Sequence, residues 1–157
     1  MAHIIREYTH ADVDGIKKCL IDLQEFERML DPQRLEGIKV AHEYLAHLLQ
    51  ICETGKGKIY VVEMQEEIIG MISVYIEDSK KHFRKSHKFA YISDLMILPE
   101  YKDRGIAKEL LEQAEEYARK HGATAIQSAV LEKHLEGINE YLRNGFHKYE
   151  VIVKKTL

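Results

Sequence analysis

An apolar run that ends at a proline and passes through a basic glycine turn into a helix is the segment of this chain best suited to chemistry. It covers residues 95–107 and reads Leu-Met-Ile-Leu-Pro-Glu-Tyr-Lys-Asp-Arg-Gly-Ile-Ala. The first N–H groups of a helix have no partner within it, and the peptide dipoles add partial positive charge there. Gly105 lets the backbone approach an oxygen closely, and Ala107 is too small to block the first turn. With the added charge of Lys102 and Arg104, the segment predicts an anion site suited to a diphosphate.

One glycine turn is also compatible with an ordinary strand-turn-helix junction whose charged residues face solvent. A second segment favours the diphosphate interpretation. Residues 137–146 read Gly-Ile-Asn-Glu-Tyr-Leu-Arg-Asn-Gly-Phe, which predicts a short helix ended by Gly145, with Tyr141 four residues earlier.

Together the two segments resemble the GNAT superfamily, the acetyl-CoA-dependent N-acetyltransferases. The family motifs are V-x-P-x-x-[RQ]-x-x-G-x-[GA] and, downstream, A-x-x-x-Y-x-x-x-G-F. The first motif is matched by Ile97, Pro99, Lys102, Gly105 and Ala107, and the second by Tyr141, Gly145 and Phe146. The resemblance extends over essentially the whole chain and implies an enzyme that moves an acetyl group from acetyl-CoA to a primary amine by direct attack.

The resemblance also implies the residues that hold the coenzyme. The diphosphate is expected on the backbone of Lys102, Asp103, Arg104, Gly105, Ile106 and Ala107, and the pantetheine arm along Met96, Ile97 and Leu98. Lys102 replaces the usual Arg or Gln and keeps the charge without a bidentate fork. His134 stands where many relatives have an asparagine, so a polar contact to the coenzyme is remade by imidazole or lost. Gly137 replaces the usual alanine, which weakens the helix start by up to ~1 kcal/mol.

Two steps of acetyl transfer find candidates near these segments. A backbone N–H of residues 95–98 is expected to stabilise the negative charge on the carbonyl oxygen, because a preformed dipole needs no rearrangement. Tyr141 matches the family tyrosine and is expected to protonate the departing thiolate as a general acid. A tyrosine with an ordinary pKa near ~10 holds its proton at neutral pH. The alternative for Tyr141 is a core aromatic that packs the short helix onto the sheet.

The group that takes a proton from the incoming ammonium is less clearly marked. Asp94 and Glu63 are both candidates, acting directly or through water. Some relatives carry a glutamate one residue before Asp94, where this chain has Ser93. Strand alternation predicts that Asp94 faces away from Ser93 and Leu95. A structural aspartate is the alternative.

The elements that must position these residues follow from apolar spacing and from glycine and proline breaks. The expected strands are residues 3–8, 58–64, 67–77, 88–98, 124–130 and 146–154, and the expected helices are residues 16–30, 39–53, 103–121 and 135–144. Gln65-Glu66 is expected to join an antiparallel hairpin. The order βααβββαβαβ predicts an α/β (α+β) fold with a mixed, mostly antiparallel sheet and about four helices, which is also the GNAT order.

Length and composition set limits on class and partners. The chain has 157 residues, 45% of them apolar and 31% charged, which suits one acetyltransferase domain over residues 1–157. A net charge of −3 gives no general attraction to nucleic acid or anionic lipid. Cys19 and Cys52 have neither metal-ligand nor disulfide spacing. No signal peptide or membrane-spanning run is evident, so we expect a cytoplasmic protein without a metal.

Three other patterns have weaker functional interpretations. His42 and His47 resemble the zinc-protease helix but are five residues apart, about 140° around a helix, so they predict a solvent-facing pair. Cys19 lies on an apolar helix stripe and is expected to be packed. Residues 80–88 are strongly basic. We expect a solvated hairpin tip there, ahead of contact with the adenosine phosphate, an acidic acceptor or RNA.

The acceptor side of the site is least determined. Only residues 146–157 follow Gly145, where relatives often have two strands and a loop over the acceptor. The pocket for a small-molecule or peptide amine is therefore expected to be shaped by residues 24–40 or by a partner subunit, and the resemblance allows a homodimer. The main alternative to an enzyme is a catalytically degenerate sensor or scaffold that binds acyl-CoA, and a more distant one is an RNA-associated protein.

Overall fold

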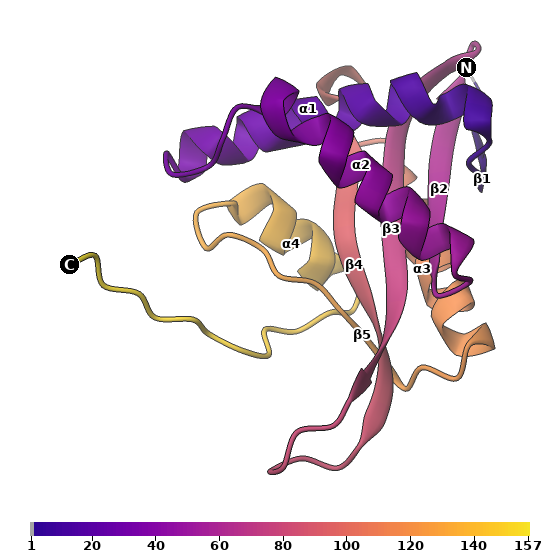
Figure 1. Ribbon diagram of the computed structural model, residues 1–157. Helices are drawn as coiled ribbons and strands as arrows, with labels where there is room; N and C mark the ends of the chain where they lie inside the picture. Colours follow the sequence, from indigo (N-terminus) through magenta and orange to yellow (C-terminus); the bar gives the residue numbers. More distant parts are fainter. Residues whose placement is uncertain (1) are drawn as a thin grey trace.

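One five-stranded sheet forms the centre of the computed structural model, which describes residues 2–157 (Figure 1). The strands are β1 (Ile4–Glu7), β2 (Gly57–Met64), β3 (Glu67–Ser79), β4 (His87–Ile97) and β5 (Ala125–Gln127). They lie in sequence order. The first four are antiparallel, and β5 is parallel to β4. The expected mixed, mostly antiparallel sheet is confirmed.

Helices cover both faces of this sheet. They are α1 (Val13–Leu30), α2 (Gly37–Glu53), α3 (Ile106–Lys120) and α4 (Leu135–Arg143), with short 3₁₀ turns at His10–Asp12 and Pro99–Tyr101. Helices α1 and α2 lie over one face and α3 lies behind the other (Figure 1). Met71 and Ile72 are adjacent on β3 and therefore point to opposite faces, yet neither is exposed. Such two-sided burial explains why the middle strands are continuously apolar.

Local sequence accounts for the tight connections. Gln65 and Glu66 both have positive φ angles, 51° and 66°, as a two-residue hairpin turn between antiparallel strands requires. The predicted hairpin is confirmed. Gly37 lies against α1, where an added Cβ would sit 2.7 Å from the carbonyl oxygen of Ile21. This close approach lets α1 and α2 pack tightly against each other.

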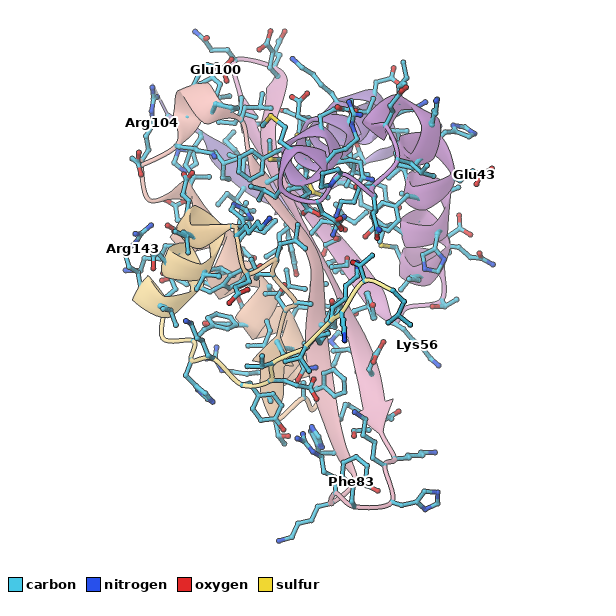
Figure 2. All side chains as sticks on the ribbon, turned by 90° about the vertical axis from the view of Figure 1, so that its left-hand side faces the viewer. Glu43, Lys56, Phe83, Glu100, Arg104 and Arg143 are labelled. Carbon is cyan, nitrogen blue, oxygen red and sulfur yellow. The ribbon has the colours of Figure 1, made fainter. Side chains whose placement is uncertain are left out.

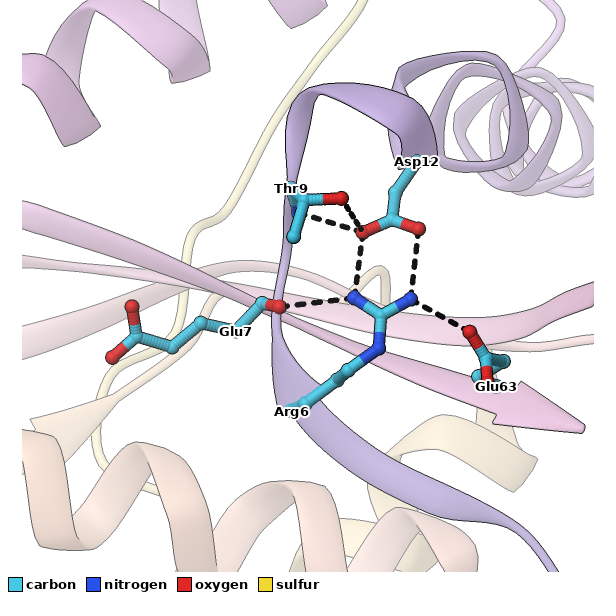
Figure 3. A network of polar contacts seen from close by, with 5 residues as sticks. All are labelled: Arg6, Glu7, Thr9, Asp12 and Glu63. Atoms are coloured by element: carbon cyan, nitrogen blue, oxygen red, sulfur yellow. Dashed lines mark hydrogen bonds and ion pairs between the residues drawn. The ribbon is translucent and has the colours of Figure 1, made fainter. Parts of the chain in front are cut away.

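Arg6 ties the first strand to the elements that follow it (Figure 3). Its two terminal nitrogens lie 2.7 and 2.9 Å from the two carboxylate oxygens of Asp12, and one of them is also 2.8 Å from Glu63 on β2. The Asp12 carboxylate also accepts the backbone N–H of Thr9 at 2.6 Å. The start of α1 is therefore held to both β1 and β2.

The predicted last strand, residues 146–154, is wrong. Residues 146–157 form no strand, and Val151, Ile152 and Val153 are 81, 87 and 90% exposed. The β-rich letters are present, but a strand also needs a neighbour to pair with, and β5 is three residues long. The observed order therefore lacks the final β of the predicted one.

The basic residues 80–86 connect the long strands β3 and β4 at one end of the molecule (Figure 2). Phe83 at this tip is 81% exposed, as expected for a solvated hairpin. Glu100 and Arg104, beside the glycine turn, lie at the opposite end (Figure 2). The 11 residues of β4 separate the two ends by roughly 35 Å, so contact between this tip and a coenzyme bound at the turn has no geometric support. Among residues 2–157, no helix combines the length and apolar character needed to cross a membrane.

Candidate active site

A cleft opens where β4 and β5 separate. The two strands pair only from Phe89 to Tyr91 on β4, and one further contact joins the Ser128 hydroxyl to the carbonyl of Ile92 at 3.0 Å. Beyond that point the outer edge of β4 has no strand beside it. The cavity there measures about 1190 Å³ and is lined by α1, β4, the start of α3, residues 128–131 and α4. The predicted strand 124–130 is shorter than expected because its second half forms the far wall of this cleft.

Backbone groups of β4 face the cleft. The N–H of Leu98 donates to the carbonyl of Ile69 on β3 at 2.8 Å. Successive N–H groups of a strand point to opposite edges, so the N–H groups of Ile97 and Leu95 point to the open edge. These groups are free to pair with an extended amide chain or with a carbonyl oxygen, the roles predicted for residues 95–98, which stay predictions.

The glycine turn lies at the end of the same edge. Gly105 has a φ of 78° and precedes α3, and Asp103 two residues earlier has a φ of 62°. No side chain caps the N-terminus of this 15-residue helix. The unpaired N–H groups of its first turn therefore remain available to an anion. Ile106 is buried and anchors the turn, and Ala107 lines the cavity as predicted.

The two basic residues of the turn behave differently. The Lys102 ammonium is 3.4 Å from Glu136 on α4 and lies over the ring of Phe26, at the edge of the cavity. The Arg104 guanidinium instead donates to the carbonyl of Glu100 at 3.3 Å and does not line the cavity. The structure thus places the side chain of Lys102 at the edge of the cavity and that of Arg104 outside it.

His134 and Gly137 fill one small space in the cleft. The imidazole packs 4.8 Å from the ring of Phe26 on α1. A Cβ added to Gly137 would lie 2.7 to 3.0 Å from three atoms of that imidazole. Burial lowers the pKa of His134, and the charge of Lys102 lowers it further, so the ring is neutral at pH 7. The glycine at position 137 is therefore explained by the size of the histidine.

Tyr141 lies on α4 and lines the cavity. Its hydroxyl donates to Ser128 at 3.3 Å, and burial raises its pKa to about 12. The ring also meets Phe146 edge-on at 5.1 Å, and the N–H of Phe146 caps α4 on the Tyr141 carbonyl. The residue thus packs the helix end and also lines the cleft with a protonated hydroxyl, and its role as a general acid stays a prediction.

Asp94 is buried on β4, 8% exposed, beside Met96 in the wall of the cavity. Its Oδ2 accepts hydrogen bonds from the Tyr44 hydroxyl at 2.6 Å and the Ser73 hydroxyl at 2.7 Å. Burial raises the pKa of this carboxyl, while hydrogen bonds from these hydroxyls oppose the rise. A carboxylate that is made more basic and still faces a cleft is a candidate proton acceptor.

The prediction that Ser93 and Asp94 face opposite ways is wrong. The Ser73 hydroxyl lies 2.6 Å from the Ser93 hydroxyl and 2.7 Å from Asp94, so both side chains reach the same side. The cause is a bulge. Ser73 pairs with Asp94 but Val74 pairs with Ile92, which leaves Ser93 as an extra residue.

Glu63, the other candidate base, does not lie in this site. Its carboxylate binds Arg6, and it is not among the residues that line the cavity (Figure 3). Sequence reasoning missed Tyr44, Ser73 and Ser128. Tyr44 lies within the predicted helix 39–53, and nothing in its spacing shows that its hydroxyl reaches Asp94.

α1, the α1–α2 connection and the tail form another wall of the cavity. Glu27 and Arg34 form an ion pair at 2.6 Å, and burial raises the pKa of Glu27. The Nε of Arg34 is buried without a hydrogen-bond partner among the described residues. Ile152 lines the cavity from the tail, and the Lys154 ammonium is 3.1 Å from Gln33. The structure therefore places part of residues 24–40 in the pocket, as expected.

The exposure of Cys19 and of the pair His42 and His47 tests two further sequence predictions. Cys19 has no exposed surface, and burial raises its pKa to about 12, which confirms a packed thiol. His42 and His47 are both exposed on α2, as expected. Within residues 2–157, no cluster of three or more His, Cys, Asp or Glu side chains is arranged to hold a metal ion.

Comparison with known proteins identifies a family whose characteristic sequence matches most of this chain, including the glycine turn and α4. A family model described as the acetyltransferase (GNAT) family matches residues 23–146. An aminoalkylphosphonate N-acetyltransferase of Salmonella typhimurium is 30% identical over 91 residues, which cover 58% of this chain and 57% of the relative. An uncharacterized N-acetyltransferase of Methanocaldococcus jannaschii is 26% identical over 153 residues, 96% of this chain. The matches span 57% and 63% of the lengths of these two relatives.

Solved structures share the fold. The aminoglycoside N-acetyltransferase AAC(6')-Iy in complex with CoA superposes with a TM-score of 0.76 at 15% sequence identity, over 99% of this chain and 95% of that one. At this level of identity the likeness concerns the fold alone. That other protein of the same fold binds CoA.

Proposed function

Because the chain belongs to the acetyltransferase (GNAT) family, we propose that residues 1–157 act as one domain that binds acetyl-CoA and acetylates a primary amine by direct attack. The observation that carries the proposal is the unpaired edge of β4, which leads directly to the uncapped, left-handed turn at Gly105. An extended amide chain can pair with that edge while its diphosphate reaches the N–H groups of α3. The cavity of about 1190 Å³ has room for such a ligand and an acceptor.

In this proposal the backbone does most of the binding. The turn from Lys102 to Ala107 holds the diphosphate, and residues 96–98 hold the pantetheine arm. His134 fills the opposite wall. Either N–H on the open edge, that of Leu95 or Ile97, is placed to donate to the carbonyl oxygen as it becomes negative.

Two side chains carry the protons. Asp94 takes a proton from the incoming ammonium, and the free amine then attacks the thioester carbon. Tyr141 supplies the proton to the departing sulfur. Its pKa of about 12 makes transfer to a water-exposed thiolate unfavourable, since a thiol has an ordinary pKa near ~8.5. The same buried surroundings raise the proton affinity of a thiolate, so transfer is expected while the sulfur is still enclosed.

The acceptor is proposed to be a small-molecule amine. The named relatives act on aminoalkylphosphonates and aminoglycosides. The pocket wall here carries both the acidic Asp94 and the Glu27–Arg34 pair, so it offers groups of either charge beside the reacting amine. A peptide amine is the second acceptor class to include in a test.

Binding is tested by calorimetry with acetyl-CoA on wild type and Gly105→Glu. The added carboxylate should abolish measurable affinity, because it would occupy the space of the diphosphate and repel its negative charge. Gly55→Glu is the matched control, because Gly55 has the same φ of 78° and equally open surroundings. Equal affinity in both variants would contradict the assignment of the turn.

Turnover is tested by thiol release from acetyl-CoA with an aminoalkylphosphonate, an aminoglycoside, a polyamine and a lysine peptide. We expect Tyr141→Phe to lower kcat by about 100-fold with unchanged acetyl-CoA affinity. Tyr60→Phe is the control, since Tyr60 on β2 is also partly buried but lies outside the cavity. Tight binding of acetyl-CoA without thiol release for any amine would instead favour the alternative of a catalytically degenerate sensor or scaffold that binds acyl-CoA.

A further inference from the structure

We propose that Tyr44 and Ser73 are positioning residues that hold the Asp94 carboxylate by one oxygen and leave the other to receive the proton of the acceptor ammonium. This inference rests on the proposed function, because it assigns Asp94 as the proton acceptor. It adds two residues, from α2 and β3, that no sequence motif marks.

The contacts are asymmetric. The Tyr44 hydroxyl at 2.6 Å and the Ser73 hydroxyl at 2.7 Å both donate to Oδ2 of Asp94. Two donors fill the in-plane acceptor positions of one carboxylate oxygen. The carboxylate is thereby fixed in rotation, and Oδ1 becomes the oxygen on which an incoming proton is expected. Since three separate elements meet here, the arrangement also ties α2 to the sheet at the level of the cleft.

The bulge in β4 makes this arrangement geometrically accessible. With regular alternation, Ser93 and Asp94 would lie on opposite faces, and only one of them could reach the Ser73 hydroxyl. The extra residue brings both to the same side. Bulges often redirect side chains beside active sites, and the position of this one within the open part of β4 fits that role.

The charged and titratable groups around Asp94 make the hydroxyls important. Four titratable groups face Asp94, and burial and, less strongly, its negative charge raise the pKa of each: Glu27 from α1, Tyr44 from α2, Tyr75 from β3 and Tyr141 from α4. Arg34, a cation that lines the same cavity, is engaged by Glu27. Burial raises the pKa of Asp94, and hydrogen bonds from the hydroxyls of Tyr44, Ser73 and Ser93 lower it. Removing one of them therefore shifts the carboxyl toward protonation.

The proton balance is direct. The ammonium N–H bond breaks, its proton goes to Oδ1 of Asp94, and the electron pair stays on nitrogen. The N–C bond then forms, the C–S bond breaks, and the sulfur takes the proton of Tyr141. The nitrogen, now bonded to the acetyl carbon, releases a second proton, which restores Tyr141 through solvent and leaves a neutral amide. Asp94 returns the first proton to solvent, so both groups start the next turnover unchanged.

The pH dependence of kcat/KM tests the inference. Asp94 must be deprotonated to act, so activity falls on the acid side of its pKa. We expect Tyr44→Phe and Ser73→Ala each to move this acid limb to higher pH by about one unit, with acetyl-CoA affinity unchanged. Ser73→Thr keeps a hydroxyl and should restore the wild-type limb. Tyr60→Phe should leave the limb in place. An unmoved limb in both test variants would overturn the inference.

A second readout does not depend on activity. Infrared spectra recorded against pH show a protonated-carboxyl band for Asp94, identified by its loss in Asp94→Asn. In Tyr44→Phe this band should appear at a higher pH than in wild type. If the protein binds acetyl-CoA but acetylates no amine, the proposed function fails while this titration still decides whether Tyr44 holds Asp94. A band that appears at the same pH in both proteins would refute the assignment of Tyr44.

Discussion

Beside the cleft, the His134 ring leaves no room for a side chain at position 137, which is therefore glycine. The imidazole occupies the volume that a methyl group at position 137 would need, with contacts as short as 2.7 Å. The ring is held in turn by Phe26. A contact to the coenzyme by His134 stays a prediction, but the structure explains why these two departures from the family motif occur together.

We expect Gly137→Ala to weaken acetyl-CoA binding several-fold, because the new methyl group displaces the His134 ring toward the cleft. The helix gains up to ~1 kcal/mol from alanine, but the steric conflict should offset that gain. The measurements are calorimetric affinity and thermal unfolding. In the double variant with His134→Asn the conflict is relieved, so the stability gain should appear. A single variant that is more stable and binds equally well would contradict this account.

At the scale of elements, the Arg6 network links β1, the start of α1 and β2 (Figure 3). The guanidinium is shared between Asp12, which is 6% exposed, and the partly exposed Glu63. Its hydrogen bonds to Asp12 are the main reason that the pKa of this carboxyl falls to about 2. The network lies away from the cleft, so its role is stability.

The sign of the resulting pH effect follows from the lowered pKa. Asp12 is more acidic in the folded protein than its ordinary value of 3.8, so its contribution is complete above about pH 4 and is lost as the pH falls toward 2. After allowance for solvent screening, we expect Asp12 to contribute roughly 1–2 kcal/mol to the free energy of unfolding. Urea unfolding at pH 6 and pH 2.5 should show a smaller loss in Asp12→Asn than in wild type. Asp14→Asn, an exposed change in the next turn, is the control. Equal losses in all three proteins would exclude this role for Asp12.

At the scale of the whole molecule, the tail after α4 contributes little burial. The residues from His147 to Leu157 are all exposed, and the last packed residue is Phe146. Truncation after Phe146 should therefore change the thermal midpoint by no more than about 3 °C. Thermal unfolding of full-length and truncated chains measures this. A large destabilisation would mean that the tail is covered in solution. Light scattering on the same samples tests the homodimer, which stays a prediction.

Much of this molecule was determined by local sequence. Hydrophobic spacing predicted the four helices, and β-rich runs with turn residues predicted the first five strands, because these signals act over a few neighbours. The glycine turn before a helix was predicted for the same reason, although the helix begins at Ile106 rather than at the predicted residue 103, because Asp103 and Gly105 both have positive φ angles. The short helix that carries Tyr141 and ends before Gly145 was also predicted, because the helix and its glycine end depend on neighbouring residues only.

Tertiary structure alone decided the rest. Strand alternation could not show the bulge at Ser93, since an extra residue is defined only against the partner strand. The separation of β4 from β5, the pairing of Tyr44 with Asp94 and the diversion of Glu63 to Arg6 each join residues far apart in sequence. The tail residues have strand-forming side chains, yet no described strand lies beside them. A strand is stable only when its backbone pairs with a neighbouring strand, and the sequence of one segment does not determine whether such a neighbour lies beside it.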